Sequence, residues 1–236
     1  MGLVTTVVLV RHGLTHLTGP VLAGWTPDLH LDDRGRVQAD AVAQRLSAVV
    51  LDAVVSSPLD RCLETAGAIA AGRAHDVVVD ERLGECRYGD WTGRPLKELV
   101  KDPLWKVVQA HPSAVVFPGP DGEALRDTQA RAVNAVRDWN ARLGPDATWL
   151  ACSHGDVIKA VVADALGLHL DQFQRISVDP CSVTVIRYTD VRPFVLRVND
   201  SAATLGELLA PAKKGRRRRA SSDAAVGGGA GPGAGA

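Results

Sequence analysis

Two histidines, His12 and His154, each follow a short apolar run and precede a glycine. The runs are residues 7–10 and 149–152, and each predicts a buried strand that brings its histidine to the carboxyl end of a sheet, with the glycine where the chain turns. That edge is where ligands bind in open α/β sheets. Arg11 directly precedes His12, and a guanidinium matches phosphate oxygens. The two histidines therefore indicate a site for phosphoryl transfer.

Phosphoryl transfer from a monoester needs positive charge near the phosphate oxygens, a nucleophile in line and a proton for the leaving oxygen. Arg11 and Arg61 each offer a planar guanidinium that can bond two phosphate oxygens. His12 is the predicted nucleophile, because a neutral imidazole attacks phosphorus without help from a metal. His154 can donate to the phosphate, aided by the amides of the helix that follows it. Glu85, on a loop over the same edge, is the predicted proton donor.

Two other carboxylates compete with Glu85 for the role of acid, since Glu81 and Asp90 lie close to it in the sequence. Two tryptophans that follow glycines, Trp25 and Trp91, also have two interpretations. They either wall the pocket or anchor the core.

The other histidines and the cysteines have mainly structural interpretations. His16 is left open between lining the pocket and facing solvent. Four histidines without a motif partner are predicted to be surface or capping residues: His30, His75, His111 and His169. The cysteines show neither CxxC spacing nor the density of a disulfide framework, so they are predicted to be reduced, mostly buried thiols: Cys62, Cys86, Cys152 and Cys181. No cluster of carboxylates and histidines has the spacing of metal ligands, so no metal and no other cofactor is expected.

Strand and helix patterns alternate through residues 1–205. Strands are predicted at residues 3–10, 53–56, 77–79, 147–152, 182–188 and 193–198. Helices are predicted at residues 34–48, 58–71, 123–143 and 156–166, with Asp32-Asp33 as an N-cap and Pro58 in a first turn. The stretch 85–122 is interrupted by Gly and Pro and has short helical pieces near 95–100 and 103–110, as expected of a cap over a site. This order predicts one α/β domain with a largely parallel sheet.

The length and composition fit a globular protein, and the reduced cysteines favour a cytoplasmic location. A chain of 236 residues with 46% hydrophobic content can bury one good core, or at most two small ones. It has no apolar run of membrane-spanning length and no basic start with a cleavage site, so neither membrane insertion nor secretion is expected.

The net charge of zero conceals a basic end. From Pro211 onward there are six Lys and Arg against the single Asp223, so this end carries +5 and residues 1–210 carry −5. Residues 206–236 are predicted to form a disordered tail, first basic and then rich in Gly and Ala, outside a catalytic domain of residues 1–205. Such a tail is expected to be dispensable for turnover of small substrates. The alternative is weak contact with an anionic partner such as nucleic acid or anionic lipid, although no aromatics interleave with the basic residues to stack on bases.

Taken together, the motifs resemble those of the histidine phosphatase superfamily, also called the phosphoglycerate mutase-like family. They follow that family's order over roughly residues 3–198. The matching pieces are Arg11-His12-Gly13, Gly24-Trp25, Leu31 through Gln38-Ala39, Ser56 through Ala66, Glu85 with Gly89-Asp90-Trp91-Thr92-Gly93, Gly122-Glu123 and Ser153-His154-Gly155.

The resemblance implies a fold, a mechanism and a pocket. The fold is a single three-layer α/β domain with a mixed, mainly parallel sheet flanked by helices. In the mechanism, His12 forms a phosphohistidine, Glu85 is first the acid and then the base, and no metal takes part. The residues that bind the phosphate are then Arg11, Gly13, Thr18, Gly24, Arg61, His154 and Gly155.

Three departures from the family pattern bear on the activity. Thr18 stands where many relatives have Asn, and Ala124 replaces the Ser that commonly follows Gly122-Glu123. Family mutases have a longer segment before the second histidine, with an arginine pair that grips a substrate carboxylate. Residues 86–153 contain no adjacent arginines.

The short segment without an arginine pair favours a phosphatase over a phosphoglycerate mutase. We therefore expect a metal-independent phosphomonoester hydrolase acting on a small phosphorylated metabolite. The alternatives are a phosphomutase of the same family and a phosphate-binding regulatory protein without turnover. The identity of the metabolite is left open, and so is the choice between a monomer and a homodimer.

Overall fold

The computed structural model describes residues 4–204, 206 and 226–230. Its strands are β1 (Thr5–Arg11), β2 (Val21–Leu22), β3 (Ala53–Ser56), β4 (Val77–Val79), β5 (Arg94–Pro95), β6 (Thr148–Ser153), β7 (Val183–Tyr188) and β8 (Pro193–Asp200). Its α-helices are α1 (Asp33–Arg45), α2 (Asp60–Ala70), α3 (Leu96–Leu99), α4 (Pro103–Ala110), α5 (Leu125–Leu143) and α6 (Gly155–Ala165). Short 3-10 helices lie at Glu81–Leu83, Gly89–Trp91, Pro112–Ala114, Leu170–Arg175 and Val226–Gly228.

Six strands form one mixed sheet in the order β4-β3-β6-β1-β7-β8. The first four run parallel to one another, whereas β7 is antiparallel to both β1 and β8. The mixed, mainly parallel sheet expected from the resemblance is therefore confirmed. Since parallel strands end at one edge, β1 delivers Arg11 and β6 delivers Ser153 to the same place, where the two residues are register partners.

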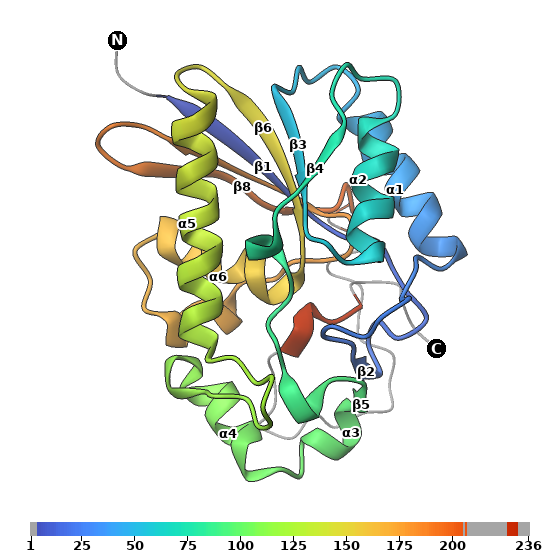
Figure 1. The fold of residues 1–236 in the computed structure, drawn as a ribbon, viewed down its shortest axis with the longest axis vertical. Coiled ribbons are helices and arrows are strands. Elements are labelled where there is room, and N and C mark those ends of the chain that lie inside the picture. The colour runs from blue at the N-terminus through green and yellow to red at the C-terminus, as the bar shows by residue number, and fades with distance from the viewer. Residues whose placement is uncertain (1–3, 205, 207–225, 231–236) are drawn as a thin grey trace.

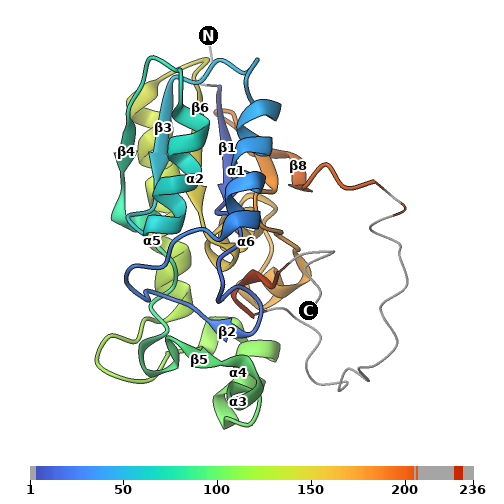
Figure 2. The same cartoon turned by 90° about the vertical axis from the view of Figure 1, so that its right-hand side faces the viewer.

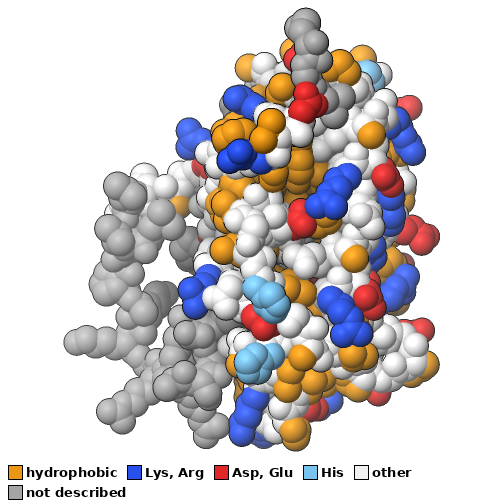
Figure 3. Space-filling model, turned by 90° about the vertical axis from the view of Figure 1, so that its left-hand side faces the viewer, with side chains coloured by type: hydrophobic (Ala, Val, Ile, Leu, Met, Phe, Trp, Pro, Cys, Tyr) orange, Lys and Arg blue, Asp and Glu red, His pale blue; other side chains and the backbone are white. Residues whose placement is uncertain are grey.

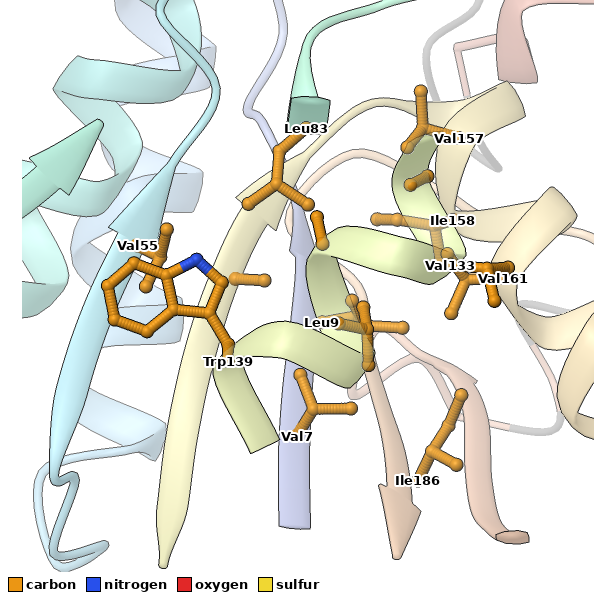
Figure 4. Close-up of a cluster of buried hydrophobic side chains, with 14 of the residues drawn as sticks. Val7, Leu9, Val55, Leu83, Val133, Trp139, Val157, Ile158, Val161 and Ile186 are labelled. Carbon is orange, nitrogen blue, oxygen red and sulfur yellow. The ribbon is translucent and has the colours of Figure 1, made fainter. Parts of the chain in front are cut away.

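Helices cover both faces of the sheet and make the expected three layers (Figures 1 and 2). Because side chains alternate along a strand, Val7 and Leu9 of β1 pack in one buried cluster with α5 and α6, and Val8 and Val10 pack in another with α1 and α2. Figure 4 shows the first cluster, with Trp139 of α5 over the sheet. Full burial of each such side chain contributes about 1.5–3 kcal/mol, so these two layers hold the strand ends rigidly.

A third buried cluster forms the cap predicted from residues 85–122. Its aromatic centre is Trp91, Trp105 and Phe117, and α3 and α4 lie within it as the two expected short helices. A two-stranded ribbon of β2 and β5 joins the cap to the loop that follows His12. The cap thus lies at the carboxyl edge of the sheet, where the two histidines are.

One predicted helix start is wrong. Pro58 does not open the second helix, because α2 begins at Asp60 with Leu59 as its N-cap. The backbone N–H of Ser57 still bonds the carbonyl of Cys152, so the chain continues the pairing of β3 with β6 for one more residue. The helix can begin only after that pairing ends.

The C-terminal segment differs from the sequence expectation over five residues. Residues 226–230 lie against the sheet edge and the cap, and Val226 is buried in the cap cluster. The expectation of disorder therefore does not hold for these five residues, because Val226 has an apolar site to occupy. Residues 207–225 and 231–236, with the basic run, lie outside the described part of the chain.

Charged side chains of both signs are mixed on one face of the molecule. Figure 3 shows Lys and Arg side chains interspersed with Asp and Glu on the face that lies to the left in Figure 1. Arg137 and Asp164 form one exposed ion pair between α5 and α6. Within the described residues, no helix has both the length and the apolar character needed to cross a membrane.

Candidate active site

The structure brings all five predicted catalytic side chains together at the carboxyl edge of the sheet. Arg11 ends β1, His12 follows it, Arg61 lies in the first turn of α2, and His154 lies between β6 and α6. Glu85 comes from the loop between β4 and the cap. Each of the five side chains is at most 6% exposed, so their charges interact in a medium of low polarity.

Hydrogen bonds on both ring nitrogens fix the orientation of His12. Its Nδ1 lies 2.7 Å from the carbonyl oxygen of Gly13. A carbonyl only accepts, so Nδ1 carries the hydrogen and Nε2 keeps its lone pair. Arg61 Nε donates to that Nε2 across 3.3 Å. Burial, followed by the charges of Arg61 and Arg11, holds the pKa of His12 well below its usual value, so the imidazole is neutral at physiological pH.

Arg61 connects the two histidines. Its Nη2 donates to the carbonyl of Gly24 at 2.7 Å and to His154 Nδ1 at 3.3 Å. Because His154 Nδ1 accepts, Nε2 carries the hydrogen and donates to Ser57 Oγ at 2.7 Å. Burial, and next the charges of Arg61 and His12, hold the pKa of His154 well below its usual value. Both histidines are therefore neutral beside a permanent positive charge.

Two guanidinium nitrogens in this site have no hydrogen-bond partner among the described residues. They are Arg11 Nε and Arg61 Nη1, and both are buried. A buried donor without an acceptor is destabilising by about 1–3 kcal/mol, and more for a charged group. Both arginines line the pocket, so an anion is the ligand that fits these donors.

The surroundings of Glu85 favour its protonated form. Burial, and next the negative charge of Asp156, raise the pKa of Glu85 to about 7. One carboxyl oxygen accepts from the backbone N–H of Cys86 at 2.9 Å, and the other lies 4.0 Å from His154 Nδ1. At neutral pH a substantial fraction of Glu85 therefore carries the proton that a leaving oxygen needs.

Four other residues are predicted to bind phosphate, and they differ in the groups that they offer to a ligand. Thr18 and Gly24 line the pocket, but the carbonyl of Gly24 is bonded to Arg61. The backbone N–H of Gly13 is already donated to Thr65 Oγ1, which places α2 beside the nucleophile loop. Gly155 begins α6, and a Cβ there would lie 2.8 Å from the Cα of Gly228.

The structure also decides most of the alternatives left open by the sequence. Glu81 and Asp90 are exposed and do not line the pocket, and His16 is exposed as well. Trp91 is buried in the cap cluster, so it anchors the core. Trp25 is half-buried, and it neither lines the pocket nor anchors the core. Its indole N–H instead donates to the backbone carbonyl of Glu85 at 2.6 Å.

Arg131 is a positioning residue that the sequence did not reveal. From α5 its guanidinium makes a two-point pair with Glu123 and donates to the carbonyls of Arg82, Gly84 and Glu85 at 2.7–2.9 Å. These bonds hold the backbone that carries the predicted acid. The only signal was Gly122-Glu123, which marks the partner of Arg131 and not Arg131 itself.

Asp156 was also missed by the sequence analysis. It is 2% exposed, directly after Gly155, and its carboxylate accepts from Tyr88 Oη at 2.9 Å and from Lys159 Nζ at 3.3 Å. Tyr88 lines the pocket, so Asp156 places a negative charge behind the pocket wall.

Among the residues the structure describes, no group of three or more His, Cys, Asp or Glu side chains is arranged to hold a metal ion. Arg11 and Arg61 are the cations that line the pocket in this part of the chain.

Comparison with known proteins gives a consistent picture. Residues 7–201 match the family described as the histidine phosphatase superfamily (branch 1). Phosphoserine phosphatase 1 of Hydrogenobacter thermophilus is 30% identical over 223 residues, which cover 88% of this chain and 97% of that protein. A probable phosphoglycerate mutase GpmB of Cronobacter sakazakii is 31% identical over 214 residues, covering 87% and 96%. The solved structure of YhfR from Bacillus stearothermophilus superposes with a TM-score of 0.74 at 32% identity, covering 83% of this chain and 97% of that one.

The position of Arg131 generates a prediction. Replacement Arg131→Lys keeps the charge but loses the fork that holds three carbonyls, so we expect kcat to fall by about tenfold to a hundredfold through displacement of Glu85. The loss should be larger for an alkyl phosphate than for p-nitrophenyl phosphate, whose leaving group needs no acid. Arg137→Lys, in the exposed pair on the same helix, is the matched control and should change neither rate. Equal losses on both substrates would mean that Arg131 only stabilises the fold.

Proposed function

The chain belongs to the histidine phosphatase superfamily, and we propose that it hydrolyses phosphomonoesters through a phosphohistidine on His12. The family hydrolyses such esters through a phosphohistidine, and the orientation of His12 is the observation that supports its assignment as nucleophile. With Nδ1 bonded to Gly13, the lone pair of the neutral ring lies on Nε2, beside the guanidinium of Arg61. We assign the catalytic domain to residues 1–205, in line with the matched residues 7–201.

In the first step, His12 Nε2 attacks phosphorus as the bond from phosphorus to the ester oxygen breaks. Glu85 gives its proton to the departing oxygen, so the alcohol leaves neutral and Glu85 becomes a carboxylate. In the second step, Glu85 takes a proton from water, whose oxygen attacks phosphorus. The P–N bond then breaks, and inorganic phosphate leaves with His12 and Glu85 in their starting states.

Arg11 and Arg61 stabilise the phosphoryl group in both steps, and His154 supports Arg61. The two guanidiniums neutralise charge on its oxygens, and their unpaired Nε and Nη1 atoms gain an acceptor when the anion binds. His154 acts through Arg61, because its Nε2 donates to Ser57 and its Nδ1 accepts from the Arg61 guanidinium. In this arrangement neither ring nitrogen has a hydrogen left for the phosphate, so the neutral ring orients Arg61 without adding charge.

Hydrolysis is favoured over transfer to a second hydroxyl. A phosphomutase must hold a second phosphorylated or carboxylated group, which calls for cations beyond those at the first phosphate. Within the described part of the chain, the cations that line the pocket are Arg11 and Arg61, both assigned to the transferred phosphoryl group. A binding protein without turnover would not need an acid with a raised pKa. A cytoplasmic location and independence from metals remain predictions.

The charges around the pocket also bear on the substrate. Asp156 places negative charge behind the wall, and no lining cation of the described residues is left to pair with a carboxylate. We propose that the substrate is a phosphate ester whose organic part is uncharged and carries a hydrogen-bond donor.

The first prediction concerns the nucleophile. His12→Ala should abolish turnover because no other side chain can accept the phosphoryl group. The wild type should form an acid-labile phosphoenzyme during rapid-quench labelling, and His12→Ala should not. The exposed neighbour provides the matched control, His16→Ala, which should retain both labelling and turnover. Labelling that persists in His12→Ala would contradict the assignment.

The second prediction concerns the pH dependence set by Glu85. The first step needs the protonated carboxyl, so kcat/KM for an alkyl phosphate should fall as the pH rises above about 7. Glu85→Gln should slow alkyl phosphates by about a hundredfold to ten-thousandfold, affect p-nitrophenyl phosphate much less, and lose the decline above pH 7. A variant that keeps this decline would exclude Glu85 as its source.

The third prediction tests the substrate class with a matched pair. Glycerol 3-phosphate and 3-phosphoglycerate share the phosphate and the middle hydroxyl, but the first ends in an alcohol and the second in a carboxylate. We expect kcat/KM to be at least about tenfold higher for glycerol 3-phosphate, a difference of about 1.4 kcal/mol. Equal values, or a preference for 3-phosphoglycerate, would refute the substrate class while leaving the mechanism intact.

A further inference from the structure

Residues 226–230 occupy the pocket that contains the catalytic side chains. Val226, Gly227 and Gly229 line this pocket together with Arg11 and His12. Val226 is only 3% exposed and packs in the cap cluster. In Figure 1 the segment is the short red helix between α6 and β2. A part of the chain more than two hundred residues from His12 thus reaches the reaction site.

Residues 226–230 accept hydrogen bonds from the guanidinium of Arg11, the group that is assigned to the phosphate. Arg11 Nη1 donates to the carbonyl oxygen of Gly228 at 2.7 Å, and Nη2 donates to that of Gly227 at 3.3 Å. Two carbonyl oxygens thus accept from the two terminal nitrogens of one guanidinium. Two oxygens of a phosphate bind arginine in the same way. On the other side, the backbone N–H of Gly227 donates to Asp156 Oδ2 at 3.1 Å.

The space left beside the segment is too small for a substrate. The remaining cavity has a volume of about 30 Å³. Pockets that hold metabolites measure roughly 300–1,000 Å³. The segment and a phosphorylated substrate therefore cannot occupy the pocket together.

The glycines explain why this segment fits. Gly228 has a φ of +84°, and a Cβ there would lie 2.9 Å from Arg11 Nη1 and 3.0 Å from the Cα of Gly155. Only glycine adopts this backbone without strain and lets two carbonyls approach one guanidinium so closely. Val226, directly before the glycines, supplies the apolar anchor.

We propose that residues 226–230 are a built-in competitor of the substrate, which holds Arg11 and Asp156 until a phosphate ester displaces it. This inference rests on the assignment of Arg11 to the phosphate. The segment carries no charge, whereas a phosphate dianion makes charge-assisted bonds about twice as strong as those of a carbonyl, so substrate can displace it. A segment on the same chain acts at an effective concentration on the order of millimolar, so it sets the substrate concentration at which the enzyme responds.

The test compares four proteins: the full chain, Gly228→Val, a chain that ends at Ala225, and the matched control Gly233→Val in the same tail. Binding of inorganic phosphate is measured by titration calorimetry, and kcat and KM are measured with one alkyl phosphate. If the segment fills the pocket nine-tenths of the time, Gly228→Val and the shortened chain should bind phosphate about tenfold more tightly and show a KM about tenfold lower. Their kcat should not change, since saturating substrate displaces the segment, and Gly233→Val should behave like the full chain.

Two results would overturn the proposal. Unchanged phosphate affinity in both altered chains would mean that the segment does not compete, and weaker affinity would mean that it is a permanent wall of the phosphate site. Thermal unfolding of each protein verifies that the compared chains are folded. If no chain binds phosphate, the assignment of Arg11 is wrong and the proposed function fails with it. That result differs from loss of competition alone, in which all four chains bind phosphate equally.

Discussion

Two guanidiniums buried at the carboxyl edge of the sheet determine the chemistry of this site. Arginine does not lose its charge in a protein, so Arg11 and Arg61 keep a positive potential in a region that water scarcely reaches. Backbone carbonyls accept some of the hydrogen bonds of each guanidinium: that of Val178 accepts from Arg11, and that of Gly24 accepts from Arg61. Arg11 Nε and Arg61 Nη1 have no partner among the described residues and can donate to an anion. The scaffold must therefore be rigid, because a small shift would leave a buried charge without its acceptors.

Burial shifts the pKa values of the reacting groups in opposite directions, because it disfavours the charged form of each. Burial, and next the positive charge of Arg61, lower the pKa values of His12 and His154 and keep both rings neutral, so that a lone pair is available on the nucleophile. Glu85 is close to both arginines, but burial and the charge of Asp156 outweigh them and raise its pKa to about 7. A neutral nucleophile and a protonated acid thus coexist at one pH, which is the combination that cleavage of a phosphate ester requires. Asp156 therefore acts on the acid from behind the pocket wall.

The sequence was sufficient for residues whose role is tied to a strand end. His12 and His154 follow short apolar runs that predict buried strands, and the parallel sheet then brings the two histidines together. The role of Arg131 could not be predicted, because an arginine on an amphipathic helix shows the same sequence pattern whether its side chain faces solvent or bonds a loop. The glycines of residues 227–229 were taken for disorder, since they bind through backbone carbonyls and so have no side-chain signature. The helix start predicted at Pro58 is wrong for a related reason. The extra pairing of Ser57 with β6 depends on a strand that lies nearly a hundred residues away in the sequence.

The stereochemical course at phosphorus tests the account most directly. A phosphorothioate ester made chiral with oxygen isotopes is hydrolysed in isotopically labelled water, and the configuration of the thiophosphate product is determined. Two successive in-line displacements, first by His12 and then by water, predict overall retention of configuration. Inversion would show a single direct attack by water, and the phosphohistidine on His12 would then not lie on the reaction path.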